Sequence, residues 1–268
     1  MNYKRVLTIA GSDPSGGAGI QADLKTISAC GCYGMSAITA VVDENTVQVN
    51  SIYSVPASFV QRQIKSVLDD IGANAIKIGM LHSSKLIYAV KETLSEYDIR
   101  NTVLDPVMVA TSGSILLEKK AINVLKNELI PQMQIITPNI PEAEILLNEK
   151  INRQEDLSLM AQKLSCHNTV SVFLKAGHLT GEELTDVFYN AESDEIIQLS
   201  SKRIATRNTH GTGCTLSSAI ASFLARGFSL NDAVLNAKEY TNQAIIHGAE
   251  YKIGKGHGPV HYFYQFWK

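Results

Sequence analysis

The sequence has no run of like charge and no long apolar run. Its net charge is −2, and only 19% of its 268 residues are charged. A nucleic-acid-binding protein carries a basic stripe that neutralises phosphates, so this class is excluded. The apolar runs are too short to span a bilayer, and the N-terminus resembles neither a signal peptide nor an Arg-rich presequence. We therefore expect a cytoplasmic protein with no nucleic-acid or membrane partner.

Cysteine is sparse, and histidine is scattered. The four Cys do not make a disulfide framework in a chain of this length, and none of them forms a Cys-x-x-Cys pair. The seven His include no His-x₃-His pair near a Cys. These spacings argue against a structural zinc site. We expect Cys30, Cys32 and Cys166 to be small buried hydrophobic residues.

Short β-branched runs alternate with segments of helical periodicity along the whole chain. We expect strands at Val6–Ala10, Ala37–Val42, Ser51–Val55, Ala75–Ile78, Thr102–Leu104, Gln134–Thr137 and Val170–Leu174, and a hairpin of Leu184–Tyr189 with Glu195–Leu199. Helices are expected near residues 20–28, 58–71, 83–97 and 118–129, from residue 138, and at Thr212–Arg226 and Leu230–His247. This order predicts one α/β domain over residues 1–268, with a mostly parallel sheet covered on both faces.

Polar and glycine residues follow several of these strands. Ligand sites in open α/β sheets lie beyond the carboxyl ends of the strands. The residues at or just after strand ends are Gly11–Asp13, Asp43–Asn45, Gly79–Met80, Asp105, Asn139 and Lys175. We expect them to meet in one site.

The segment Gly211-Thr212-Gly213-Cys214 stands at the start of an apolar helix. A helix start presents unpaired N–H groups and the positive end of the dipole, and it commonly binds phosphate. A thiol in this field is expected to have a pKa below the free value of about 8.5. The pattern suggests phosphoryl transfer with Cys214 accepting a proton. The alternative is an ordinary glycine-rich helix start.

A second glycine-rich turn spans residues 10–19, between a strand and a helix. It matches neither G-x-G-x-x-G nor the Walker A pattern, because no Lys follows its last Gly. Its small residues either let a flat ligand approach the backbone or serve only a tight strand-to-helix turn. Asp23, one turn into the helix, is expected either to face that ligand or to be solvated.

Asn139 and Glu142 lie three residues apart at a helix start, and therefore on one face. Such a pair suits Mg²⁺ bound largely through water, and equally suits a capping box. Lys175 ends a buried strand, where a lysine is costly unless it meets an anion. We expect His210 to be a structural neighbour of the helix start.

Longer motifs resemble one family from end to end. They are LTIAGSDPSGGAGIQADLKT (7–26), KIGM (77–80), VLDPVM (103–108), TPNIPEA (137–143), NTHGTGCT (208–215) and GKGHGPVH (254–261). On these motifs the chain is identified as similar to the hydroxymethylpyrimidine and phosphomethylpyrimidine kinases of thiamine biosynthesis, in the ribokinase-like superfamily.

The resemblance implies a three-layer α/β/α fold and a homodimer. It implies a kinase that uses ATP and Mg²⁺ to phosphorylate a pyrimidine alcohol and then the monophosphate. The implied pyrimidine-binding residues are Glu44, Gly11, Asp23, Met80 and Val107. Cys214 would be catalytic, with Gly211, Thr212 and Gly213 as the anion hole. Lys175, Asn139 and Asp105 would bind the nucleotide, and Glu142 and Asp105 the metal.

One departure and two alternatives remain. The family usually has Lys-Gly-Gly where this chain has Lys175-Ala176-Gly177, which leaves in doubt any role that needs a positive φ at residue 176. A pyridoxal kinase of the same lineage is one alternative, although pyridoxal lacks the amine next to a ring nitrogen that would match Glu44. The other alternative is a non-catalytic pyrimidine sensor, which would not need Glu142, Lys175 and the anion hole together.

Overall fold

The computed structural model describes residues 3–109 and 116–267. Its main sheet consists of β1 (Arg5–Ala10), β2 (Tyr33–Ile38), β5 (Ala75–Ile78), β6 (Thr102–Leu104), β7 (Ile135–Ile136), β8 (Ser171–Leu174), β9 (Glu183–Asn190) and β10 (Glu195–Lys202). The strand order is β10-β9-β8-β7-β6-β5-β1-β2. The pairs β8–β9 and β9–β10 are antiparallel and the others are parallel. The predicted mostly parallel sheet is confirmed.

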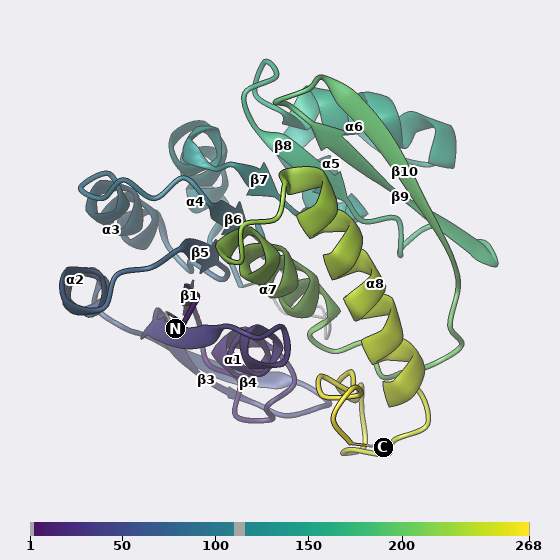
Figure 1. Ribbon diagram of the computed structural model, residues 1–268, viewed down its shortest axis with the longest axis horizontal. Helices are drawn as coiled ribbons and strands as arrows, with labels where there is room; N and C mark the ends of the chain where they lie inside the picture. The colour runs from purple at the N-terminus through teal and green to yellow at the C-terminus, as the bar shows by residue number, and fades with distance from the viewer. Residues whose placement is uncertain (1–2, 110–115, 268) are drawn as a thin grey trace.

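Helices cover both faces of this sheet (Figure 1). One layer holds α2 (Ala57–Asp70), α3 (Ser84–Leu94), α4 (Lys119–Val124), α5 (Ile140–Leu147) and α6 (Leu157–Leu164), and the other holds α1 (Gly19–Ala29), α7 (Thr212–Ala225) and α8 (Leu230–Gly248). Side chains alternate between the faces of a strand. In β1, therefore, Leu7 and Ile9 pack in the core with α2 and α3, whereas Val6 packs with α7. The predicted three-layer α/β/α fold is confirmed.

A small antiparallel ribbon, β3 (Ala40–Glu44) with β4 (Val49–Ser54), stands apart from the main sheet. The single strand predicted at Ala37–Val42 is therefore wrong, since the chain changes sheet at Thr39. The amide of Thr39 donates to the carbonyl of Ala10 (2.9 Å), and its hydroxyl donates to the carbonyl of Met80 (2.8 Å). These bonds anchor the ribbon beside the ends of β1 and β5.

Two helices differ from the sequence prediction. The helix expected at 118–129 begins as α4 and continues as a wider π-helical segment, Leu125–Leu129. Helix α6 was not predicted, because its eight residues give barely two turns of periodicity.

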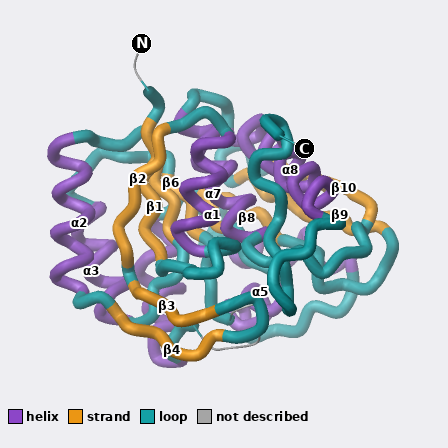
Figure 2. The backbone as a smooth tube through the Cα atoms, turned by 90° about the horizontal axis from the view of Figure 1, so that it is seen from below, coloured by secondary structure: helices purple, strands orange, loops and turns teal. Residues whose placement is uncertain are grey.

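The ribbon, the start of α7 and the carboxyl ends of the parallel strands lie at one edge of the molecule (Figure 2). In the described residues, no helix is both long enough and apolar enough to cross a membrane.

Candidate functional site

Helix α7 begins where the two glycine-rich segments meet. Gly211 caps the helix with a left-handed backbone, φ 77°. A Cβ atom at this position would overlap the carbonyl oxygen of Gly17, so only glycine fits. The first turn leaves N–H groups, among them those of Gly213 and Cys214, without an intrahelical acceptor. The predicted anion hole therefore has the backbone it needs, held against the turn after β1.

Cys214 lies half-buried in this first turn. The expected fall of its pKa is wrong. Burial raises the pKa of the Cys214 thiol to about 12, although the ammonium of Lys77 and the N–H of Gly19 both oppose the rise. The loss of hydration outweighs the nearby positive charge. At neutral pH the free protein therefore presents a neutral thiol at the helix start.

A fully buried ion pair lies close to Cys214. Both carboxylate oxygens of Asp23 are 2.8 Å from Nζ of Lys77. The hydroxyls of Thr8 (2.6 Å) and Ser218 (2.7 Å) also donate to Asp23. The interpretation of Asp23 as a solvated residue is therefore wrong. Its carboxylate has no exposed surface, so it has no room for direct contact with a ligand. Asp23 instead holds Lys77, whose pKa is raised because the nearby negative charge, chiefly that of Asp23, outweighs the opposing effect of burial.

The apolar residues predicted for pyrimidine binding come together. A Cβ on Gly11 would lie 2.6 Å from Cε of Met80, so this glycine lets the methionine pack against the end of β1. Met80 belongs to a small buried cluster with Ala40 and Val42 of β3, against which Val107 packs. Gly11, Met80 and Val107 thus form one apolar surface under the β3–β4 ribbon.

Glu44 ends β3 at the edge of this surface. One carboxylate oxygen of Glu44, one of Asp13 and a ring nitrogen of His210 all lie within 4.8 Å of one another. The pKa of Glu44 is raised to about 7, mainly by burial and also by the charge of Asp13 and a hydrogen bond to it, while His210 opposes the rise. His210 is a neighbour of the helix start, as expected, but it also joins this acidic pair.

The residues predicted for nucleotide binding meet at the start of α7. Oδ1 of Asp105 is 3.0 Å from Nζ of Lys175 and accepts a bond from the hydroxyl of Thr137 (3.2 Å). A Cβ on Gly213 would lie 3.1 Å from Oδ2 of Asp105 and 3.2 Å from Nζ of Lys175. The carboxylate and the ammonium therefore border the anion hole directly. Lys175 meets an anion at its strand end, as its sequence position requires.

Asn139 and Glu142 form the capping box that was one of the two interpretations. The Asn139 side chain accepts from the Glu142 amide (2.9 Å), and Oε2 of Glu142 accepts from the Asn139 amide (2.8 Å). Burial raises the pKa of Glu142 to about 7, against the opposing charge of Lys175. Asp105 also faces this carboxyl, so a metal role for Glu142 is compatible with the cap.

Ala176 is accommodated without strain. It is absent from the positive-φ residues of the described chain, so the doubt raised by the missing glycine is removed. Its amide donates to Asp186 (2.7 Å), and its side chain is buried.

Two residues near the site received no role from the sequence. Lys77 is the only charged residue in the apolar strand β5, and this isolated charge was the available signal. Asp13 was noticed only as a strand-end residue. Its partner His210 is 197 positions away, a separation that no local pattern can bridge.

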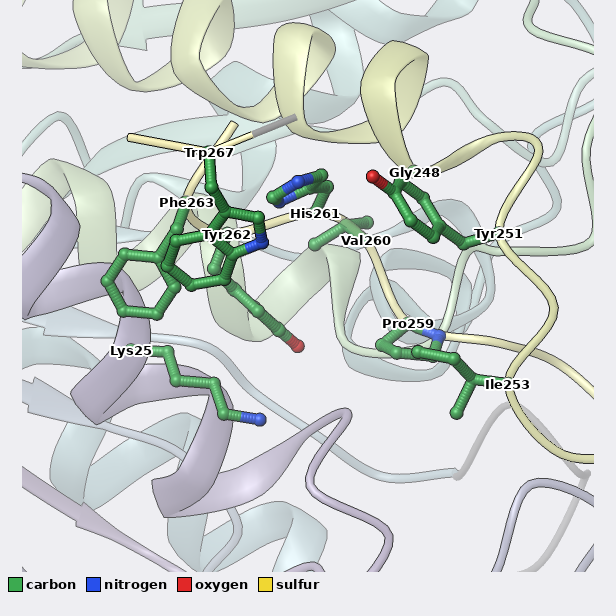
Figure 3. Close-up of a pocket in the computed structure, with 10 residues that line it drawn as sticks. All are labelled: Lys25, Gly248, Tyr251, Ile253, Pro259, Val260, His261, Tyr262, Phe263 and Trp267. Atoms are coloured by element: carbon green, nitrogen blue, oxygen red, sulfur yellow. The ribbon is translucent and has the colours of Figure 1, made fainter. Parts of the chain in front are cut away.

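The C-terminal segment contacts the turn between β3 and β4 and the first glycine-rich turn. Amides of Gly256 and His257 donate to Thr46 in the turn between β3 and β4 (3.2 and 2.8 Å). A surface pocket of about 250 Å³ lies behind the first glycine-rich turn (Figure 3). It is lined by Lys25, Gly248, Tyr251, Ile253, Pro259, Val260, His261, Tyr262, Phe263 and Trp267. Lys25 and Tyr262 donate to carbonyls of that turn, so they brace it from outside the site.

Comparison with known proteins connects this site to one family. The family model described as phosphomethylpyrimidine kinase matches residues 13–261. The hydroxymethylpyrimidine/phosphomethylpyrimidine kinase of Escherichia coli (strain K12) is 45% identical over 268 residues, covering 100% of both chains. The corresponding kinase of Rhizobium meliloti (strain 1021) is 45% identical over 263 residues, covering 98% of both.

Solved structures give the same fold and name two activities. The phosphomethylpyrimidine kinase of Clostridium difficile 630 is 42% identical with a TM-score of 0.78, covering 90% of this chain and 99% of that one. An ADP complex of Bacillus subtilis pyridoxal kinase is 35% identical with a TM-score of 0.88, covering 97% of both. The two kinases and the solved structure named above at 42–45% identity bear the pyrimidine name, whereas the pyridoxal kinase is 35% identical. The chain therefore belongs to the hydroxymethylpyrimidine/phosphomethylpyrimidine kinase family, which is the ribokinase-like kinase family that its motifs predicted.

Proposed function

We propose that this protein is an ATP-dependent kinase of thiamine biosynthesis. It phosphorylates 4-amino-5-hydroxymethyl-2-methylpyrimidine and then phosphorylates the monophosphate. The observation that carries the proposal is the start of α7, where Cys214 follows Gly213 and the Cβ position of Gly213 faces both Asp105 and Lys175. An acceptor placed there contacts Cys214 while its ring rests on the Gly11, Met80 and Val107 surface.

The ring side suits a flat aminopyrimidine. Gly11 offers backbone without a side chain, and Met80 and Val107 offer apolar contact. An aminopyrimidine edge has one donor and one acceptor, so Glu44 matches both only when the pair holds one extra proton. A pKa of about 7 for Glu44 supports this match.

The phosphate side suits a nucleotide with a divalent cation. Asp105 and Glu142 offer the carboxylate oxygens that Mg²⁺ prefers, and Lys175 and the amides of residues 211–213 offer positive partners for phosphate. The missing side chain of Gly213 leaves Oδ2 of Asp105 and Nζ of Lys175 facing the anion hole, which fits a bound phosphate. Bound Mg²⁺ would neutralise the phosphate charge that develops during transfer. Asn139 positions Glu142 through the capping box.

Cys214 serves this reaction as a positioning thiol next to the attacking oxygen. Since burial keeps the thiol neutral in the free protein, it holds the hydroxyl by a weak hydrogen bond and is a poor base at rest. The transfer then relies on alignment and on the charges of Lys175 and the anion hole. Asp23 acts indirectly, by holding Lys77 close to the thiol.

The proposal extends to the assembly and the compartment. We propose that residues 1–268 form one kinase domain, because its eight main strands share one sheet. We further propose a homodimer in the cytoplasm, on the family resemblance.

A turnover assay with ATP, Mg²⁺ and the pyrimidine alcohol tests the activity. Product analysis should show the monophosphate first and the diphosphate later. Binding of the alcohol without turnover would instead support the non-catalytic sensor.

A second activity, on pyridoxal, is favoured by one observation. The similar pyridoxal kinases superpose with TM-scores of 0.87–0.88, at 33–35% identity. The same assay with pyridoxal tests it. We expect a lower kcat/KM for pyridoxal than for the pyrimidine alcohol, because pyridoxal has no amine beside a ring nitrogen to pair with Glu44.

A further inference from the structure

Asp13 is a buried carboxylate surrounded by hydrogen-bond donors. Its side chain accepts from the amides of Ser15 (2.7 Å), Gly17 (3.0 Å) and Ala18 (2.6 Å). Nε2 of His210 lies 2.8 Å from Oδ2 of Asp13. Burial alone would raise the pKa of Asp13, but His210, Ser15 and Ala18 together hold it well below its usual range. Asp13 therefore keeps its charge although it is only 1% exposed.

Glu44 arrives at this carboxylate from a different sheet. It ends β3, and one of its oxygens lies within 4.8 Å of both Asp13 and His210. Two carboxyl groups this close disfavour each other's ionised form, and the one with fewer hydrogen-bond donors keeps its proton to higher pH. Asp13 has the donors of its own turn and of His210. The shared proton therefore belongs to Glu44.

The other charged and titratable groups near this cluster have hydrogen-bond partners of their own. Lys25 of α1 donates to the Gly16 carbonyl (2.8 Å), on the outer side of the turn. Tyr262 of the C-terminal segment donates to the Gly17 carbonyl. Asp43, the neighbour of Glu44 on β3, is exposed and accepts from Asn50 of β4 (3.2 Å).

We propose that Asp13, held by His210, keeps Glu44 protonated and thereby makes it a specificity group for an aminopyrimidine edge. Protonated Glu44 donates to a ring nitrogen and accepts from the exocyclic amine, and its proton stays on the carboxyl group. Asp13 and His210 are positioning residues that contact the substrate only through Glu44. This inference rests on the proposed pyrimidine substrate.

The proposal predicts how affinity depends on pH. The protonated form of Glu44 binds, so affinity is full below its pKa and is lost as the pH rises through about 7. The loss should approach tenfold per pH unit, the slope of a single proton. Glutamine presents the same donor and acceptor without a titrating proton, as it does on adenine.

The experiment measures binding of the pyrimidine alcohol by calorimetry, without ATP, from about pH 5.5 to about pH 8.5. The proteins are wild type, Glu44→Gln, Asp13→Asn, the Asp13→Asn/Glu44→Gln double variant and the matched control Asp43→Asn. We expect a falling profile for wild type and Asp43→Asn, and a flat one for Glu44→Gln. In Asp13→Asn the midpoint of the affinity profile should move to lower pH. In the Glu44→Gln background, Asp13→Asn should not change the affinity further.

Two results would overturn the proposal. One is a flat wild-type profile. The other is an equal loss at every pH in Asp13→Asn that persists in the Glu44→Gln background, which would make Asp13 a purely structural residue of the turn. If Asp13→Asn does not fold, the infrared band of a protonated carboxyl group decides. Near pH 6.5 it should be stronger in wild type than in Glu44→Gln, because protonated Glu142 contributes equally to the band of both proteins. Absence of binding and turnover in wild type at every pH would instead refute the proposed function itself.

Discussion

Glu44 ends β3 and Glu142 lies in the first turn of α5, and burial is the main cause that raises the pKa of each to about 7. The neighbouring charge with the larger effect differs in sign. For Glu44 it is the carboxylate of Asp13, which adds to the rise and is partly offset by His210, whereas for Glu142 it is the ammonium of Lys175, which opposes the rise and is partly offset by Asp105. A divalent cation would displace a proton from Glu142, because metal ligands must be deprotonated. A neutral pyrimidine gives Glu44 no reason to lose its proton. In the proposed function, the same pKa would serve metal binding at Glu142 and hydrogen-bond recognition at Glu44.

The largest effect is expected at Gly211, where the start of α7 contacts the first glycine-rich turn. In Gly211→Ala, the new Cβ would overlap the Gly17 carbonyl and would force the two glycine-rich segments apart. We expect turnover to be abolished and the Tm to fall. Gly227→Ala is the matched control, since Gly227 also has positive φ (93°) but open space around its Cβ position. It should cost about 1–2 kcal/mol of stability and leave turnover intact. Equal effects in both variants would mean that backbone strain, and not the contact with Gly17, explains the loss.

The next effect concerns Cys214, in the first turn of α7. The alcohol must lose a proton as it attacks, whereas the monophosphate, with a second pKa of about 6, is already an anion. Since burial keeps the thiol neutral, we expect Cys214→Ala to slow both steps to a similar extent and Cys214→Ser to restore both. The measurement is the two rates, assayed separately with purified alcohol and monophosphate. A loss of about 10²–10⁴-fold confined to the alcohol step would establish Cys214 as the base and contradict the positioning role.

Changes at Glu44 should affect the ring side alone. Glu44→Ala leaves the amine and ring nitrogen unpaired and should weaken pyrimidine binding by about 1–3 kcal/mol. Glu44→Gln should keep substantial activity. The KM for ATP should be unchanged in both variants. Unchanged pyrimidine affinity in Glu44→Ala would remove this residue from the pocket.

The smallest effect is expected on the phosphate side. Glu142→Gln keeps an acceptor for the Asn139 amide but loses the charge that faces a cation. The Tm should therefore stay close to wild type, while the Mg²⁺ concentration needed for half-maximal turnover should rise. Pyrimidine affinity should not change. Superimposable Mg²⁺ curves for the two proteins would leave Glu142 as a capping residue only.

Local pattern was sufficient for much of the fold. The alternation of β-branched and helical segments predicted the main-sheet strands other than β2, together with the hairpin and the last two helices, because each of these segments is bounded by turn residues or carries a regular apolar pattern. The local sequence pattern failed at Thr39, where the chain passes from the main sheet to the β3–β4 ribbon within one apolar segment. That change depends on bonds to Ala10 and Met80, which are 29 and 41 positions away.

The sequence by itself determined the family, the strand-end positions of the site and the presence of a thiol at a glycine-rich helix start. Only the tertiary structure decided the ionisation of that site. The pKa of Cys214 rises rather than falls, Asp23 is committed to Lys77, and Glu44 meets Asp13 and His210. The physical reason is that desolvation and charge pairing depend on neighbours in space, which here range from Asp13 and Glu44, 31 residues apart, to Asp13 and His210, 197 residues apart.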